Sequence, residues 1–142
     1  MHRKEKQILM KQNEKKEYPA ELLAEVETYL SSYLMESHML EVELRRQKAA
    51  AYAAEAGQFQ RERREDAALY CRARMYEIKE FVRSLPDGEE KVFLFSRYLC
   101  GDRPDRIAED MNISLRSVYR LRRRALNIAA GRYCQQKKRP GA

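Results

Sequence analysis

The chain has 142 residues, 44% hydrophobic and 36% charged, with only five glycines and four prolines, which excludes a turn-rich β-sandwich or barrel and predicts an all-α fold. No apolar run approaches the ~18 residues that cross a bilayer, so we expect no membrane-spanning helix. The net charge of +7 is concentrated at one end, because residues 112–142 contain nine Lys or Arg and no acid. A basic end of this kind predicts a polyanionic partner.

The first part of the chain has the pattern of one long helix behind a charged arm. Residues 1–18 are rich in Lys, Glu and Gln, and we predict a flexible charged arm there. Pro19 suits the first turn of a helix, and nothing interrupts that helix before about Ala56. Within it, positions spaced alternately by four and three form a heptad seam, as in a coiled coil. The seam positions are Val26, Leu30, Tyr33, Ser37, Leu40, Leu44, Gln47 and Ala51.

A second long helix is predicted from Phe59 to Leu85, after a break at Gly57. Its apolar residues again step by three and four, and they are Ala68, Cys71, Met75, Ile78, Val82 and Leu85. Such seams need partner helices, so we expect residues 19–86 to oligomerise or to bind another protein. The pattern fits an antiparallel hairpin within one chain, a coiled coil between the chains of a homodimer, or both.

A further helix is predicted after residues 86–88, which carry the helix-ending sequence Pro-Asp-Gly. Asp87 followed by Glu90 matches a capping box, with Asp as the N-cap. The helix is expected to reach about Cys100, before a break at Gly101. The residues that we expect to be buried in this region and on the preceding helix are Cys71, Phe93, Phe95, Tyr98 and Cys100.

The stretch 107–121 has the apolar skeleton of a helix-turn-helix. A short helix begins at Pro104, and Asn112 stands at the following turn, where a positive φ is needed and Asn tolerates one. Ser114 is a natural N-cap for the next helix. The positions that packing determines are Ile107, Ala108, Met111, Ile113, Val118 and Leu121. We therefore predict a helix-turn-helix DNA-binding domain over residues 87–136.

The outward face of the second helix of this motif carries the predicted contacts with DNA. Arginine can bind guanine edges bidentately, while Ser, Tyr and a helix N-terminus suit phosphates. The candidate DNA-binding residues are Arg103, Arg106, Ser114, Arg116, Ser117, Tyr119, Arg120, Arg123, Arg124 and Asn127. Arg122 falls on the apolar side instead, and we expect it to cover the edge of the core or to pair with an acid. Residues 137–142 are predicted to be a mobile basic tail that binds phosphates.

The same stretch resembles region 4 of bacterial sigma factors. The resemblance rests on Ser96-Arg97-Tyr98, Ile107-Ala108-Glu109, Ile113-Ser114, Val118-Tyr119 and Arg124-Ala125-Leu126, and it covers about residues 87–136. The layout as a whole is similar to small phage and prophage transcriptional regulators of Gram-positive bacteria. It implies that the second helix of the motif enters the major groove and that RNA polymerase is a conceivable partner. Two departures are Asn112 in place of the usual turn glycine and Arg106 where an acid is common.

These patterns predict a sequence-specific transcription regulator that binds double-stranded DNA as a homodimer. The alternative is a DNA-packaging or assembly protein of the small-terminase kind, and a weaker third hypothesis is a helical adaptor whose basic end binds RNA or anionic lipid. No nucleophile–base pair, phosphate-binding glycine loop or cluster of metal ligands is recognised, so we expect no enzyme activity, metal or cofactor. The three isolated cysteines indicate reduced thiols in a cytoplasmic protein.

Overall fold

The computed structural model describes residues 17–52 and 58–137, and within these ranges the chain forms helices and no strand. This confirms the all-α prediction. The elements are α2 (Ala20–Tyr52), α3 (Gln58–Arg83), α4 (Glu89–Leu94), the π-helical segment η1 (Phe95–Leu99), α5 (Pro104–Met111) and α6 (Leu115–Lys137). No described helix is long and apolar enough to cross a membrane.

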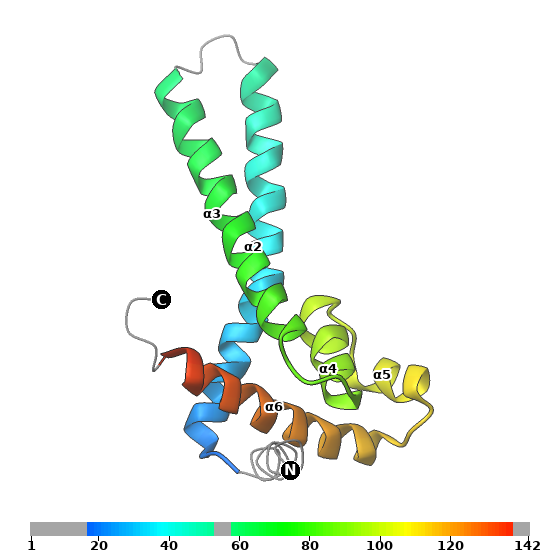
Figure 1. The fold of residues 1–142 in the computed structure, drawn as a ribbon. Coiled ribbons are helices and arrows are strands. Elements are labelled where there is room, and N and C mark those ends of the chain that lie inside the picture. Colours follow the sequence, from blue (N-terminus) through cyan, green and yellow to red (C-terminus); the bar gives the residue numbers. More distant parts are fainter. Residues whose placement is uncertain (1–16, 53–57, 138–142) are drawn as a thin grey trace.

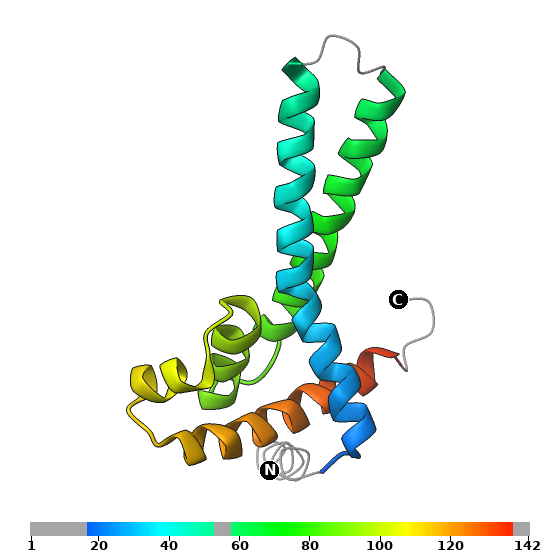
Figure 2. The same ribbon diagram turned by 180° about the vertical axis from the view of Figure 1, so that it is seen from behind.

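The two longest helices, α2 and α3, run antiparallel and side by side, and their upper halves extend well beyond the other helices (Figures 1 and 2). Each helix contributes its expected apolar seam near the foot of the pair, where Val26, Leu30 and Ile78 are fully buried. Higher up the seam is less complete, and Leu44 is exposed. The predicted break at Gly57 lies outside the described residues, as does the side chain of Ala51.

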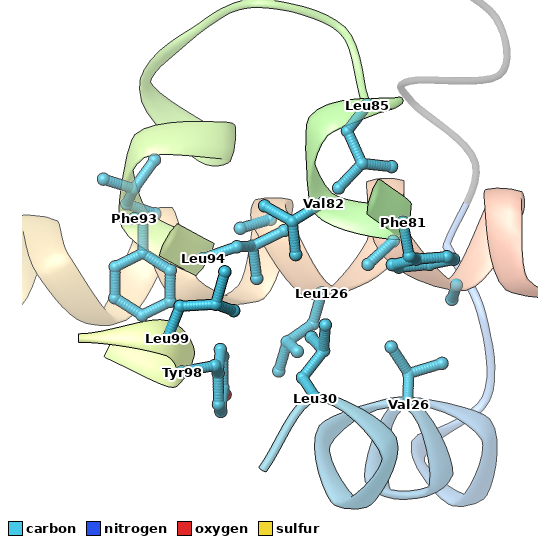
Figure 3. Packing of buried hydrophobic residues seen from close by; sticks show 14 of the residues in the cluster. Val26, Leu30, Phe81, Val82, Leu85, Phe93, Leu94, Tyr98, Leu99 and Leu126 are labelled. Carbon is cyan, nitrogen blue, oxygen red and sulfur yellow. The ribbon is translucent and has the colours of Figure 1, made fainter. Parts of the chain in front are cut away.

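The core lies at the foot of the hairpin, where α2, α3, α4, η1 and α6 meet. Helix α6 crosses under the hairpin, and Leu126 on it faces Leu30 and Val26 of α2 (Figure 3). From the other side, α4 and the end of α3 contribute apolar side chains to the same cluster. The boundary expected at residue 86 therefore does not separate two cores, because one buried cluster includes residues from both sides of it.

The π-helical segment η1 changes which residues face the core. The buried pairs Phe93–Leu94 and Tyr98–Leu99 are five residues apart, a spacing that the wider turn of a π-helix places on one side. Phe95 lies between these pairs and is exposed, so the expectation that it belongs to the core was wrong. Cys100 is also exposed, contrary to expectation, because it ends the segment just before the chain turns at Gly101, whose φ is 77°.

The start of α4 corrects another expectation. Its N-cap is Gly88 rather than Asp87, and no side chain caps the helix. The Asp87 carboxylate instead accepts a hydrogen bond from Lys91 Nζ at 3.0 Å. Glu89 and Glu90 occupy the first turn, where the helix dipole favours negative charge.

Candidate nucleic-acid interface

A tight turn joins α5 to α6 and orients the basic face of α6. Asn112 adopts the left-handed conformation expected for it, with φ 55° and ψ 48°. The amide of Ile113 donates to the Ala108 carbonyl at 3.0 Å, which closes the C-terminal end of α5. On the other side of the turn, Ser114 Oγ accepts a hydrogen bond from the Ser117 amide at 3.1 Å. Ser114 is therefore the N-cap of α6, as the sequence indicated.

Packing sets the rotation of α6 about its axis. Ile107 of α5 and Val118 and Leu121 of α6 are buried against each other's helices in the common core. With these residues inward, the i, i+3 and i+4 spacing turns the arginines of α6 toward solvent. The predicted inward and outward sides of this helix thus match its burial pattern up to Arg124.

Two arginines dominate the open part of this face. Arg116 and Arg120 are exposed, one turn apart, and neither forms an ion pair with any described residue. Tyr119 is exposed beside them, and Ser117 is half-buried. Arg103, at the N-cap of α5, is exposed as well. The three arginines and Tyr119 can therefore reach a ligand without breaking an ion pair with a described residue, whereas Ser117 Oγ already accepts a hydrogen bond from the Ser114 hydroxyl at 3.0 Å.

Three other candidate arginines contact acids in weak, exposed pairs. Arg123 lies 3.9 Å from Glu17, and Arg106 lies 3.7 Å from Asp110 one turn along α5. Arg124 faces the acidic first turn of α4, with its Nε 3.5 Å from a carboxylate oxygen of Glu90. Exposed pairs of this kind contribute about 0–1 kcal/mol, so a phosphate could displace the acids at little cost.

Asn127 was predicted to bind DNA, and the structure assigns it a different role. Only 7% of it is exposed, because the chain just before α2 lies across this part of α6. Its Oδ1 accepts a hydrogen bond from the Tyr18 amide at 2.9 Å, and its Nδ2 donates to the Arg123 carbonyl at 2.9 Å. The open part of the basic face therefore ends near Arg124. Tyr18, which we assigned to the flexible arm, packs against the core instead.

Arg122 pairs with an acid, as we expected from its position on the apolar side of α6. Its guanidinium donates to Glu27 of α2 at 2.5 Å, and the Tyr98 hydroxyl donates to the same carboxylate oxygen at 2.5 Å. Burial acts to raise the pKa of Glu27, but these two hydrogen bonds, together with the positive charges of Arg122 and Arg97, outweigh it and hold the pKa below its ordinary value. The same burial and the adjacent carboxylate raise the pKa of Tyr98. Sequence reasoning did not identify Glu27, which lies 95 residues from its partner.

The predicted phosphate-binding tail begins with a residue that is already engaged. Lys137 is the last residue of α6, where its Nζ pairs with Glu25 of α2 and lies 4.8 Å from the centre of the Tyr133 ring. The hydrogen bonds from Lys137 and Tyr133 lower the pKa of Glu25. Lys137 therefore ties α6 to α2 in this structure, and the remainder of the tail lies outside the described residues.

Comparisons with protein-family models, with curated proteins and with solved structures find no match to this chain. Within residues 17–52 and 58–137, no group of three His, Cys, Asp or Glu residues could hold a metal ion.

Proposed function

We propose that the protein binds double-stranded DNA through the exposed basic face at the start of α6. The observation that carries the proposal is the pair Arg116 and Arg120, which are exposed and form no ion pair with the described residues. They follow a tight turn with an N-cap, so the amides at the start of α6 lie beside them. An exposed helix of this kind can enter the major groove, where arginine reads guanine edges and the helix N-terminus favours phosphates.

Charge distribution supports a polyanion as the partner. Helix α6 carries seven Lys or Arg residues and no acid. Three of its cations, Arg122, Arg123 and Lys137, contact acids of α2 or of the chain just before it. The positive charge left open is concentrated toward the first half of α6, where Arg116 and Arg120 lie, with Tyr119 between them.

We further propose that the protein is a sequence-specific transcription regulator of phage or prophage type, acting as a homodimer through its long helices. The resemblance of residues 87–136 to sigma region 4 supports this choice, and it makes RNA polymerase a second conceivable partner. A DNA-packaging protein of the small-terminase kind is the alternative. Exposed apolar residues on both α2 and α3 favour some form of self-association, which both functions require.

The test is duplex binding by the variant Arg116→Ala/Arg120→Ala, measured by fluorescence anisotropy over a series of salt concentrations. We expect affinity to fall about tenfold or more, because each contact with a base or phosphate contributes roughly 1–3 kcal/mol. If both arginines contact phosphates, the slope of log affinity against log salt should fall by roughly 1.8.

The matched control is Arg72→Ala/Arg83→Ala, which removes the same charge from exposed positions on α3. This control should bind DNA nearly as well as the wild type. Equal losses in the two variants would mean that only net charge matters and would contradict a specific face on α6. Unchanged binding in the α6 variant would refute the proposal.

A further inference from the structure

The first two turns of α6 carry two apolar side chains that the core does not cover. Leu115 is 44% exposed and Tyr119 is 55% exposed. Neither belongs to the buried core or to the partly buried residues that pack against it. They are four residues apart, so they lie on the same side of the helix, one turn from each other.

This apolar pair lies directly beside the open arginines. Leu115 precedes Arg116 in the sequence, and Tyr119 precedes Arg120. Because successive residues of a helix are rotated by about 100°, the exposed side of α6 has two parallel stripes, one apolar and one of guanidinium groups. A polyanion that binds the arginines therefore also meets the apolar stripe, and the best ligand presents apolar groups next to its acceptors.

The major groove of DNA offers this combination. Guanine presents two acceptors to arginine there, and the C5 methyl of thymine is the apolar group among the base edges. Leu115 has no side-chain group that can form a hydrogen bond. Against other base edges it would take polar groups out of water without replacing their hydrogen bonds, which costs free energy. Against a thymine methyl, two apolar surfaces leave water together, which is favourable.

The position of Leu115 on α6 suits a contact with base edges. It is the first residue of the helix, directly after the N-cap Ser114. Side chains of a helix lean toward its N-terminus, so Leu115 projects at the tip of α6. In a helix-turn-helix, the N-terminal residues of the second helix contact the base edges. The ring of Tyr119, one turn further along, can contact a methyl group in the same way.

We propose that Leu115 and the ring of Tyr119 contact thymine methyl groups in the major groove, beside guanines that Arg116 and Arg120 bind. This inference rests on the proposed function and names the class of sequence that the face of α6 prefers. That class is a duplex in which thymine lies within about two base pairs of guanine. The distance follows because one turn of a helix rises about 5.4 Å, whereas base pairs stack about 3.4 Å apart.

The first experiment selects the preferred duplex from a random pool with the full chain. Each thymine of that duplex is then replaced, one at a time, by uracil, which lacks only the C5 methyl. Fluorescence anisotropy measures the affinity for each duplex. The wild type should bind about fourfold more weakly when a contacted thymine is replaced, because one methyl group is no longer buried. Uracil at the other positions should have no effect.

The variant Leu115→Ala assigns one of these methyl contacts to a side chain. It should bind the thymine duplex about fourfold more weakly or worse, and it should no longer distinguish thymine from uracil at one position. Leu44→Ala is the matched control, because Leu44 is 40% exposed but lies in the upper half of α2. This control should keep both the wild-type affinity and the full sensitivity to uracil.

Two substitutions of Tyr119 separate its ring from its hydroxyl group. Tyr119→Phe keeps the ring and should keep the sensitivity to uracil at every contacted position. Tyr119→Ala should lose that sensitivity at a position different from the one assigned to Leu115. Circular dichroism of each variant checks that the helices persist.

Two outcomes would overturn this inference while leaving the proposed function intact. In the first, the duplex is bound through Arg116 and Arg120, but uracil in place of thymine changes the affinity at no position. In the second, Leu115→Ala keeps the full wild-type response to uracil at every position. Failure of the wild type to bind any duplex would instead refute the proposed function itself, so the two failures can be told apart.

Discussion

The foot and the upper half of the hairpin are built from the same two helices with the same heptad pattern, yet they differ in burial. Leu30 and Leu44 both occupy the seam of α2, and they are fully buried and 40% exposed, respectively. The difference comes from neighbours, because α4, η1 and α6 pack around the foot and no described element packs around the upper half. Two paired helices therefore bury a heptad seam only in part, and further helices must pack against the seam to bury it fully.

The largest expected effect is the loss of stability on truncating Leu30, and it can be compared directly with the loss on truncating Leu44. Leu30→Ala should lower the free energy of unfolding by about 3 kcal/mol, because it leaves a cavity in a packed core. Leu44→Ala should lower it by less than about 1 kcal/mol, since much of that side chain is already in water. Urea unfolding followed by circular dichroism measures both. Equal losses would show that the upper seam is as well packed as the foot.

The side-chain amides of Asn127, at the foot of the hairpin, and Gln47, in its upper half, provide a second comparison. Asn127→Ala should destabilise the protein by about 1–2 kcal/mol, because the Tyr18 amide would lose its acceptor. Gln47 lies in the upper seam, and its buried Nε2 has no hydrogen-bond partner among the described residues. Gln47→Leu should therefore raise stability, by up to about 1 kcal/mol. Thermal unfolding of the two variants tests this, and a destabilised Gln47→Leu would reveal a partner for that amide.

The smallest expected effect concerns the ion pair that joins α2 to α6. Glu27→Gln should cost at most about 1 kcal/mol at pH 7, a modest value because 36% of the Glu27 side chain and 41% of the Arg122 side chain are exposed and solvent screens the charges. The pKa of Glu27 is lowered on folding, so its contribution is complete above pH 4.5 and is lost as the pH falls through the folded-state value.

Urea unfolding of wild type and Glu27→Gln should be measured between pH 3 and pH 7. The difference between their free energies of unfolding should become smaller as the pH falls below 4.5. Glu80→Gln is the control, because its pair with Arg83 at 3.4 Å is more exposed and lies within one helix. A gap between wild type and Glu27→Gln that stays constant down to pH 3 would contradict the assigned role.

Local sequence signals predicted the turn before α6 well. Asn112 and Ser114 have the conformation and the capping bond that their residue types suggested. The start of α5 at Pro104 also agrees, because proline is favoured in the first turn of a helix. These features depend on a few neighbouring residues, which is why a single sequence was sufficient to find them.

Other residues were misassigned because their environment comes from distant parts of the chain. The outward position of Asn127 on α6 follows from helical periodicity, but the chain around Tyr18 covers it. Phe95 is of a residue type that usually lies in the core, but the π-helical turn leaves its side chain exposed. Neither effect has a signature within the surrounding sequence window.

Periodicity and residue type alone determined that the chain is helical, where most of its helices begin and end, and which side of α6 carries the arginines. Only the tertiary structure decided how much of that side stays open and which acids the remaining cations meet. The physical reason is range: helix formation and capping depend on residues within about four positions. The pairing of Glu27 with Arg122, by contrast, joins positions 95 residues apart and exists only when α2 crosses α6.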